Sequence, residues 1–230
     1  MDYYHRAGSR PIAYGLGNKG AGLMKRELAL PFHRLDWPRK SRVERFFLEH
    51  ALLISDFMVA LEMACRNRPG IRLFTEDDLQ LRDDSVAGRN PFRWRVNIPG
   101  ASKCGVIPDR VFGLESPDGS RTWFLLEADR GTMPVTRRRL EKSSFRRKLL
   151  AYQATWAQNL HLTHFGWERF RVLTITTEAD RLATMQAACR ALKRGQGLFL
   201  FAVTGALREQ PDAFMLRWQT WRGSEATLLG

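Results

Sequence analysis

The spacing of apolar residues predicts a chain in which helices and strands alternate. Over 41–66, apolar residues recur every three or four positions, as on one face of a helix. Ser41 with Glu44 three residues later is typical of a capping box, and Pro69-Gly70 should end this helix. Further helices are predicted over 143–158 and 179–193.

Shorter apolar runs between these helices predict strands. They lie at 71–74, 92–98, 106–114, 121–129, 171–177, 198–204 and 214–218. Asp118-Gly119 is a hairpin signal that joins 106–114 to 121–129. The runs WFLLEA, RVLTIT and LFLFAV are apolar on both faces, which indicates central strands covered on both sides. The pattern predicts an α/β fold with a mixed central sheet flanked by helices.

The first part of the chain has a different character. It is rich in glycine and suggests a hairpin-like piece with a turn of helix, too small to form a core alone. Pro31, Pro38 and the charged residues at 40–42 indicate a boundary. We therefore divide the chain into a small segment, 1–38, and a main domain, 39–230.

The net charge of the chain indicates which class of partner it binds. The 230 residues include 37 Lys and Arg against 24 Asp and Glu, a formal net charge of +13. Such an excess favours a polyanion, most often nucleic acid, over an anionic membrane surface or an acidic protein. The chain has no apolar run long enough to span a membrane, no secretory signal and no CxxC pair. We expect a cytoplasmic DNA-binding protein that does not associate with a membrane.

Acidic residues interrupt two of the apolar strands. Asp109 lies in 106–114, and Glu127 and Asp129 lie on one face of 121–129, because side chains alternate along a strand. The hairpin between these strands should bring Asp109 opposite Glu127. Three converging carboxylates need a cation or basic groups to neutralise them, and oxygen ligands suit Mg²⁺ or Mn²⁺. The pattern predicts a metal site formed by Asp109, Glu127 and Asp129.

Two of these acids also have a purely structural interpretation. Asp109 is placed to cap a turn, and Asp129-Arg130-Gly131 is placed to form a strand-end turn with a local ion pair. His50 lies on the apolar stripe of the first long helix, which favours a hydrogen-bonded core histidine over a catalytic one.

A strongly basic segment follows the acids, and we call residues 137–148 the basic segment. Glu141 is its only acidic residue. Its basic residues are Arg137, Arg138, Arg139, Lys142, Arg146, Arg147 and Lys148. We expect it to contact DNA phosphates, the alternative being a solvated helix face. Lys148, one helical turn before Tyr152, is placed to reach the end of the sheet that carries the acids.

Several fragments resemble the plasmid replication-relaxation family. They are HALLISDFMVAL, VIPDRVFGLESPDGSRTWFLLEADRGT, SFRRKLLAY and FRVLTITTEADR. In addition, RPIAYGLGNKGAGLM is similar to the wing of that family's winged helix, which implies a winged-helix remnant in 1–38 without the helix-turn-helix. The resemblance implies a DNA-binding role in replication, relaxation or mobilisation of a plasmid or mobile element, together with other proteins of that element.

The same region resembles the PD-(D/E)xK nuclease core. Asp109 matches the first acid and Glu127 the second, whereas Asp129 stands where Lys is usual, so Lys148 would replace that lysine from the next helix. The resemblance implies a restriction-endonuclease-like fold and a Mg²⁺- or Mn²⁺-dependent nickase or nuclease with Asp109, Glu127 and Lys148 as catalytic residues. The alternative is a non-catalytic DNA-binding or assembly protein that retains the fold.

Overall fold

The computed structural model describes residues 18–28, 45–76, 78, 92–100, 103–210 and 212–229. The chain divides into two compact units, residues 1–48 and 49–230. In the first unit, α1 (Asn18–Leu28) occupies the later part of the segment compared above with a winged-helix wing. The predicted boundary after residue 38 and the capping box at Ser41 lie outside the described residues.

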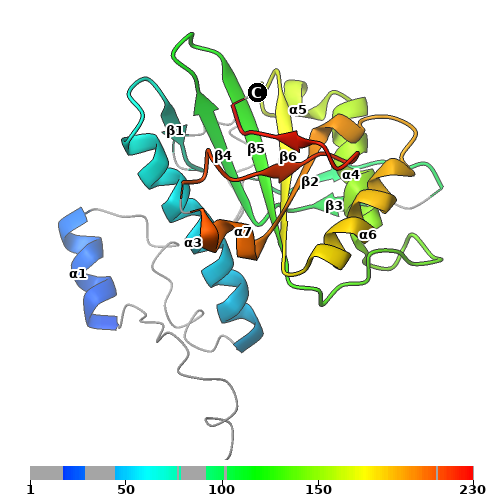
Figure 1. The fold of residues 1–230 in the computed structure, drawn as a ribbon, viewed down its shortest axis with the longest axis horizontal. Helices are drawn as coiled ribbons and strands as arrows, with labels where there is room; N and C mark the ends of the chain where they lie inside the picture. The colour runs from blue at the N-terminus through cyan, green and yellow to red at the C-terminus, as the bar shows by residue number, and fades with distance from the viewer. Residues whose placement is uncertain are drawn as a thin grey trace, which may run out of the picture. The chain divides into compact units, whose positions relative to one another are not determined.

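The second unit is formed around a seven-stranded sheet in the order β1-β4-β5-β6-β7-β8-β9 (Figure 1). Its strands are β1 (Arg72–Phe74), β4 (Arg110–Glu115), β5 (Arg121–Asp129), β6 (Phe170–Thr176), β7 (Phe199–Val203), β8 (Trp218–Gln219) and β9 (Glu225–Ala226). Strands β5, β6 and β7 are parallel, and the other pairs are antiparallel. The prediction of a mixed central sheet is confirmed.

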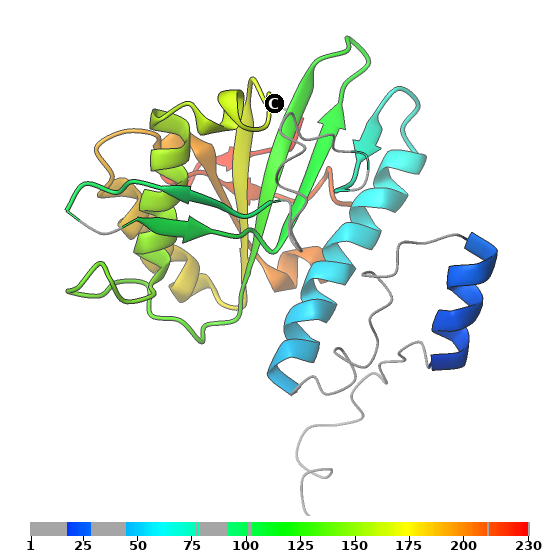
Figure 2. The ribbon, with the colours of Figure 1, turned by 180° about the vertical axis from the view of Figure 1, so that it is seen from behind.

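Helices cover both faces of this sheet (Figures 1 and 2). One face packs against α4 (Phe145–Ala157), α6 (Ala179–Arg190) and the small sheet of β2 (Trp94–Val96) and β3 (Cys104–Val106). The other packs against α3 (Arg45–Arg66) and α7 (Thr204–Glu209). Alternation along β5 divides Leu125 and its neighbour Leu126 between the two cores. The central strands are therefore buried on both sides, as their apolar runs predicted.

Two predicted strands are shorter than expected. The run 106–114 is divided between β3 and β4, which belong to different sheets. Pro108 lies at the division, where the absence of a backbone N–H prevents a continuous ladder. The run 214–218 is mostly a turn, because the Asp212 carboxylate accepts the Phe214 N–H (3.0 Å) and only Trp218 joins the sheet.

Smaller elements complete the unit. The short helix α5 (Leu160–Thr163) follows α4, and the 3-10 turn η3 (Gln196–Leu198) precedes β7. The hairpin predicted at Asp118-Gly119 joins β4 to β5. None of the helices that the structure describes is long and apolar enough to cross a membrane.

Candidate functional site

The β4–β5 hairpin brings the first two predicted acids together. Gly119 in its turn has a φ of 79°, a conformation that glycine adopts without a steric penalty. From this turn the two strands run antiparallel, with Arg110 opposite Leu126. One step further in the same register, Asp109 lies across from Glu127.

Backbone groups hold Asp109 in this place. Its N–H donates to the Leu126 carbonyl (3.0 Å), and its Oδ2 accepts the N–H of Ala128 (2.8 Å). One carboxylate oxygen is thus anchored to the partner strand β5, and not to the N–H of a local turn as the turn-capping interpretation expected. The other, Oδ1, lies 3.3 Å from Nε2 of His50 and remains on the side open to solvent.

Glu127 is held from helix α4. Its side chain is only 4% exposed. The ammonium of Lys148 forms an ion pair with Oε2, and the hydroxyl of Tyr152 donates to Oε1. Lys148 and Tyr152 are one helical turn apart on the same side of α4, which explains how both reach one carboxylate. The side chain of Lys148 is 38% exposed, so this part of the site has access to solvent.

The pKa values of these groups reflect burial and mutual proximity. Burial raises the pKa of Glu127 above its usual value, the Asp109 carboxylate raises it further, and Lys148 opposes the rise. Burial also raises the pKa of Tyr152, and the Glu127 carboxylate adds to that shift. For Lys148, burial acts to lower the pKa, but Glu127 and Asp109 outweigh it and the pKa is raised. Lys148 therefore keeps its positive charge beside two carboxyl groups.

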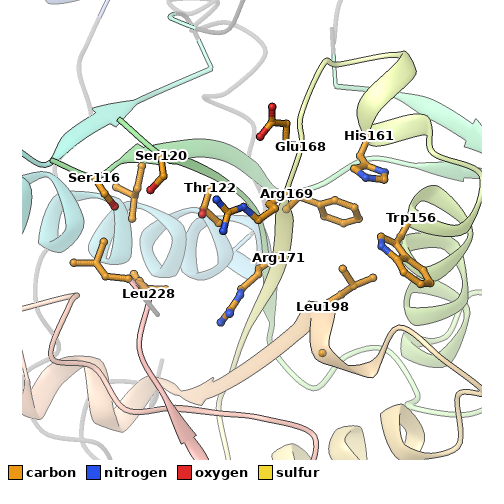
Figure 3. Close-up of a pocket in the computed structure, with 14 residues that line it drawn as sticks. Ser116, Ser120, Thr122, Trp156, His161, Glu168, Arg169, Arg171, Leu198 and Leu228 are labelled. Carbon is orange, nitrogen blue, oxygen red and sulfur yellow. The ribbon is translucent and has the colours of Figure 1, made fainter. Parts of the chain in front are cut away.

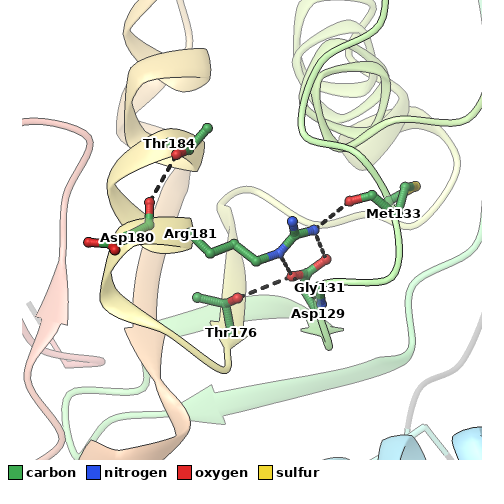
Figure 4. A network of polar contacts seen from close by, with 7 residues as sticks. All are labelled: Asp129, Gly131, Met133, Thr176, Asp180, Arg181 and Thr184. Atoms are coloured by element: carbon green, nitrogen blue, oxygen red, sulfur yellow. Dashed lines mark hydrogen bonds and ion pairs between the residues drawn. The ribbon is translucent and has the colours of Figure 1, made fainter.

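Asp129, in contrast, is part of a separate network (Figure 4). Arg181 from α6 binds both of its carboxylate oxygens, with 2.8 Å from Nη2 to Oδ1. The Thr176 hydroxyl and the Gly131 N–H each donate to Oδ2 at 3.1 Å. The Arg181 guanidinium also donates to the carbonyl of Met133 (2.5 Å). Asp129 is therefore fully engaged in joining the end of β5 to β6 and α6.

The predicted convergence of three carboxylates is wrong. Within the described ranges, no group of three or more His, Cys, Asp or Glu side chains is placed to share a metal ion. The strand-end interpretation of Asp129 is correct as to the turn, which the Gly131 N–H forms. Its ion-pair partner is Arg181 instead of the neighbouring Arg130. The physical reason is that a guanidinium from α6 reaches Asp129 and neutralises it.

Two of the three acids remain candidate ligands of a divalent cation. Asp109 and Glu127 lie close enough for the charge of Asp109 to raise the pKa of Glu127. Mg²⁺ is commonly held in proteins by one or two carboxylates, with water and substrate phosphate oxygens completing its shell. Asp109 and Glu127 would hold such an ion, and Asp129 would not.

His50 differs from its interpretation as a core histidine. Its side chain is 32% exposed and lies against Asp109. The preceding residue, Glu49, forms an ion pair with Arg130 just beyond β5. These contacts hold the start of α3 against the end of the sheet where Asp109 and Glu127 lie. Among the α3 side chains that the structure describes, the first buried one is Ile54, one turn after His50.

The basic segment divides into anchored and free residues. Arg137 donates to the Ser143 carbonyl (3.0 Å), and Arg147 donates to the Glu141 carbonyl (2.7 Å), so both stabilise the loop before α4. Lys148 is paired with Glu127, and the remaining four have exposed side chains without an ion pair or hydrogen bond to any residue in the described part of the chain. These are Arg138, Arg139, Lys142 and Arg146. Four cations are thus free to meet an external anion.

The sequence pattern missed part of this site. It assigned Tyr152 to the helix core, although the spacing Lys148-x-x-x-Tyr152 places both side chains beside one carboxylate. It contained no signal for Arg181, which lies 52 residues after Asp129 and meets it only through the parallel pairing of β5 and β6.

Comparison with known proteins gives one match. The model of the replication-relaxation family matches residues 2–167, well over half of the chain. This range includes α3, the β4–β5 hairpin and most of the contacts around Glu127. No curated protein and no solved structure matches the chain significantly. The chain therefore belongs to the replication-relaxation family.

Proposed function

We propose that this protein binds DNA and hydrolyses a phosphodiester bond at the site formed by Asp109, Glu127 and Lys148. The replication-relaxation family indicates a role in the replication or relaxation of a plasmid or mobile element. The observation that carries the proposal is the ion pair between Lys148 and Glu127. Glu127 lies across the β4–β5 ladder from Asp109. Two acids and a lysine at one strand end form the residue set of a PD-(D/E)xK nuclease.

The lysine in this proposal comes from helix α4. The strand position that normally carries it is Asp129, which Arg181 binds. Lys148 supplies an ammonium from a different element, and that ammonium contacts the same glutamate. The chemistry requires a positive charge beside the two acids, and a lysine from the strand or from the helix supplies that charge.

The side chains have separate tasks in this proposal. Tyr152 fixes the orientation of Glu127, and the Ala128 N–H fixes that of Asp109. Lys148 stabilises negative charge that develops on the phosphate. A divalent cation held by Asp109 and Glu127 supplies Lewis acidity and makes water a better nucleophile at neutral pH.

DNA would be held by the basic segment. Its free residues Arg138, Arg139, Lys142 and Arg146 lie just after β5 and at the start of α4. The same two elements carry Glu127 and Lys148. Phosphates bound by the free cations would thus lie near the proposed catalytic groups, and binding would depend little on base sequence.

The N-terminal segment and the cellular context complete the proposal. We propose that residues 1–38 are a remnant of a winged helix, and that the protein acts in the cytoplasm with other proteins of the same mobile element.

A second candidate is a DNA-binding protein without catalysis. The observation in its favour is that both carboxylate oxygens of Glu127 already have partners, Lys148 and Tyr152. A buried acid so satisfied is able to serve stability alone. In that case the basic segment would still bind DNA.

Incubation of the purified protein with supercoiled plasmid tests the proposal. We expect nicked or linear product with Mg²⁺ or Mn²⁺ and none with EDTA. Glu127→Gln should abolish the product, and Glu141→Gln, on the nearby loop, should not. Wild-type protein that binds the plasmid without cutting it would favour the second candidate. Equal nicking by the Glu127→Gln variant would contradict the assigned site.

A further inference from the structure

A second candidate site lies at the opposite end of the sheet (Figure 3). A pocket of about 280 Å³ opens where the parallel strands β5 and β6 begin, and Thr122 and Arg171 are among the residues that line it. Glu127 lies near the other end of β5. At about 3.3 Å per residue, Thr122 and Glu127 are separated by roughly 16 Å along the strand. The pocket is therefore independent of the proposed catalytic groups.

The pocket offers positive charge to a ligand. Arg171 has no hydrogen bond or ion pair to any residue that the structure describes, and Figure 3 shows it between Leu228 and Leu198. Arg169 lies beside it and interacts electrostatically with the exposed Asp118. Glu168 is also at the rim, but its carboxylate points away from Arg171 (Figure 3). Two guanidinium groups near one hollow suit a phosphate.

A buried histidine supplies the second, independent feature. His161 lines the pocket and is 7% exposed, and its Nδ1 is buried without a hydrogen-bond partner among the described residues. Burial lowers its pKa, which a hydrogen bond to the backbone of Thr155 partly offsets, so the ring is neutral at pH 7. With one nitrogen donating to that backbone, Nδ1 is an acceptor. Unsatisfied buried groups of this kind are rare, and a hydroxyl or amino group is the kind of donor that would satisfy this one.

Apolar surface borders the same pocket. The indole of Trp156 is 37% exposed, and Leu198 and Phe170 lie near it. An exposed indole is a stacking platform for a planar ring. The pocket therefore combines cations, a buried hydrogen-bond acceptor and an aromatic surface, and its volume is near the lower limit for small-ligand sites.

We propose that this pocket binds a nucleotide, either free or as the phosphorylated end of a DNA strand. The phosphate would contact Arg169 and Arg171, a sugar hydroxyl or base amino group would donate to Nδ1 of His161, and the base would stack near Trp156. A nucleotide carries all three complements in one molecule of suitable size. This site is distinct from the proposed catalytic site, and its occupation requires no cleavage.

Calorimetric titration without divalent metal tests the proposal. We expect 2′-deoxyadenosine 5′-monophosphate, or a 5′-phosphorylated ten-residue oligothymidylate, to bind with a Kd below about 1 mM, the lower limit of useful affinity. Deoxyadenosine and inorganic phosphate should each bind at least tenfold more weakly. Binding of the mononucleotide would identify a free nucleotide as the ligand, and binding of the oligonucleotide alone would identify a strand end.

Substitutions assign the binding to this pocket. Arg171→Gln should weaken binding at least tenfold. Arg169 is exposed, so Arg169→Gln tests the pocket even if Arg171→Gln impairs folding, and it should also weaken binding at least tenfold. Arg208→Gln, an exposed arginine of α7, is the control and should leave the affinity for both nucleotide probes unchanged. Absence of binding of both nucleotide probes, equal affinity for inorganic phosphate, or full binding by the folded Arg171→Gln and Arg169→Gln variants would overturn the proposal. Because no readout involves nicking, these outcomes are separate from a failure of the proposed nuclease function.

Discussion

Glu127 and Asp129 point to the same face of one strand, two residues apart, yet their surroundings differ. Glu127 contacts a lysine whose side chain is partly exposed, with Asp109 across the ladder. Asp129 is bound by a guanidinium that is itself mostly buried, and by a hydroxyl and a backbone N–H. Both oxygens of Glu127 are engaged from α4, by one partly exposed and one buried side chain, whereas the partners of Asp129 come from the strand end, β6 and α6. Position on a strand decides which face a carboxylate occupies, but its neighbours decide what it does.

The sharpest test of this comparison is the loss of the Glu127 charge. Glu127→Gln keeps the volume and an acceptor for the Tyr152 hydroxyl, but removes the ligand charge. We expect plasmid nicking to fall by about 1000-fold, within the range for loss of an essential acid–base or ligand group. Asp109→Asn should act similarly, and DNA binding should persist in both. If wild type does not nick the plasmid and the two substitutions change only the stability of the protein, both acids have a structural role.

Asp129→Asn tests the other carboxylate. It leaves the buried guanidinium of Arg181 without its counter-ion, so the free energy of unfolding should fall by about 3 kcal/mol. Urea denaturation measures this change. Glu225→Gln, which breaks the exposed ion pair with Arg217, is the control and should change stability by less than about 1 kcal/mol. Loss of nicking by folded Asp129→Asn protein would contradict the division between the two carboxylates.

Lys148→Ala should have an intermediate effect on catalysis. Without the ammonium, charge on the phosphate is less stabilised, and we expect cleavage to slow by roughly 30-fold. Because the charge of Lys148 opposes the rise in the pKa of Glu127, its removal raises that pKa further. The pH at which the cleavage rate rises should therefore be higher for the variant than for wild type, and a pH–rate profile measures this shift. An unchanged profile would mean that Lys148 does not influence the ionisation of Glu127.

The smallest expected effect concerns the free cations of the basic segment. Each substitution among Arg138→Ala, Arg139→Ala, Lys142→Ala and Arg146→Ala should reduce the slope of log affinity against log salt by about 0.9. Fluorescence titrations with duplex DNA at several salt concentrations measure the slope. Lys193→Ala, an exposed lysine beyond α6, is the matched control for Lys142→Ala. Equal slopes for all variants would identify a solvated surface instead of a DNA-binding one.

Much of the fold was predictable because it depends on local pattern. The predicted strand 121–129 coincides with β5, and the end of the first long helix coincides with the end of α3 at Arg66. The errors occurred where local pattern was ambiguous. The apolar run 106–114 contains a proline at the change of sheet, and the short α7 begins at Thr204, where a strand was predicted to end. Sequence periodicity carries no information about which sheet a strand joins.

For the site, the sequence by itself determined which side chains share a face and which lie one helical turn apart. The alternation of β5 placed Glu127 and Asp129 on one side, and helix spacing placed Lys148 beside Tyr152. Only the tertiary structure decided their partners, because those contacts join residues 21 to 52 positions apart. Arg181 reaches Asp129 from α6, and His50 reaches Asp109 from α3. Local geometry is set by bonds between neighbouring residues, whereas the pairing of charges depends on how the helices pack on the sheet, and that packing assigned the two carboxylates to different networks.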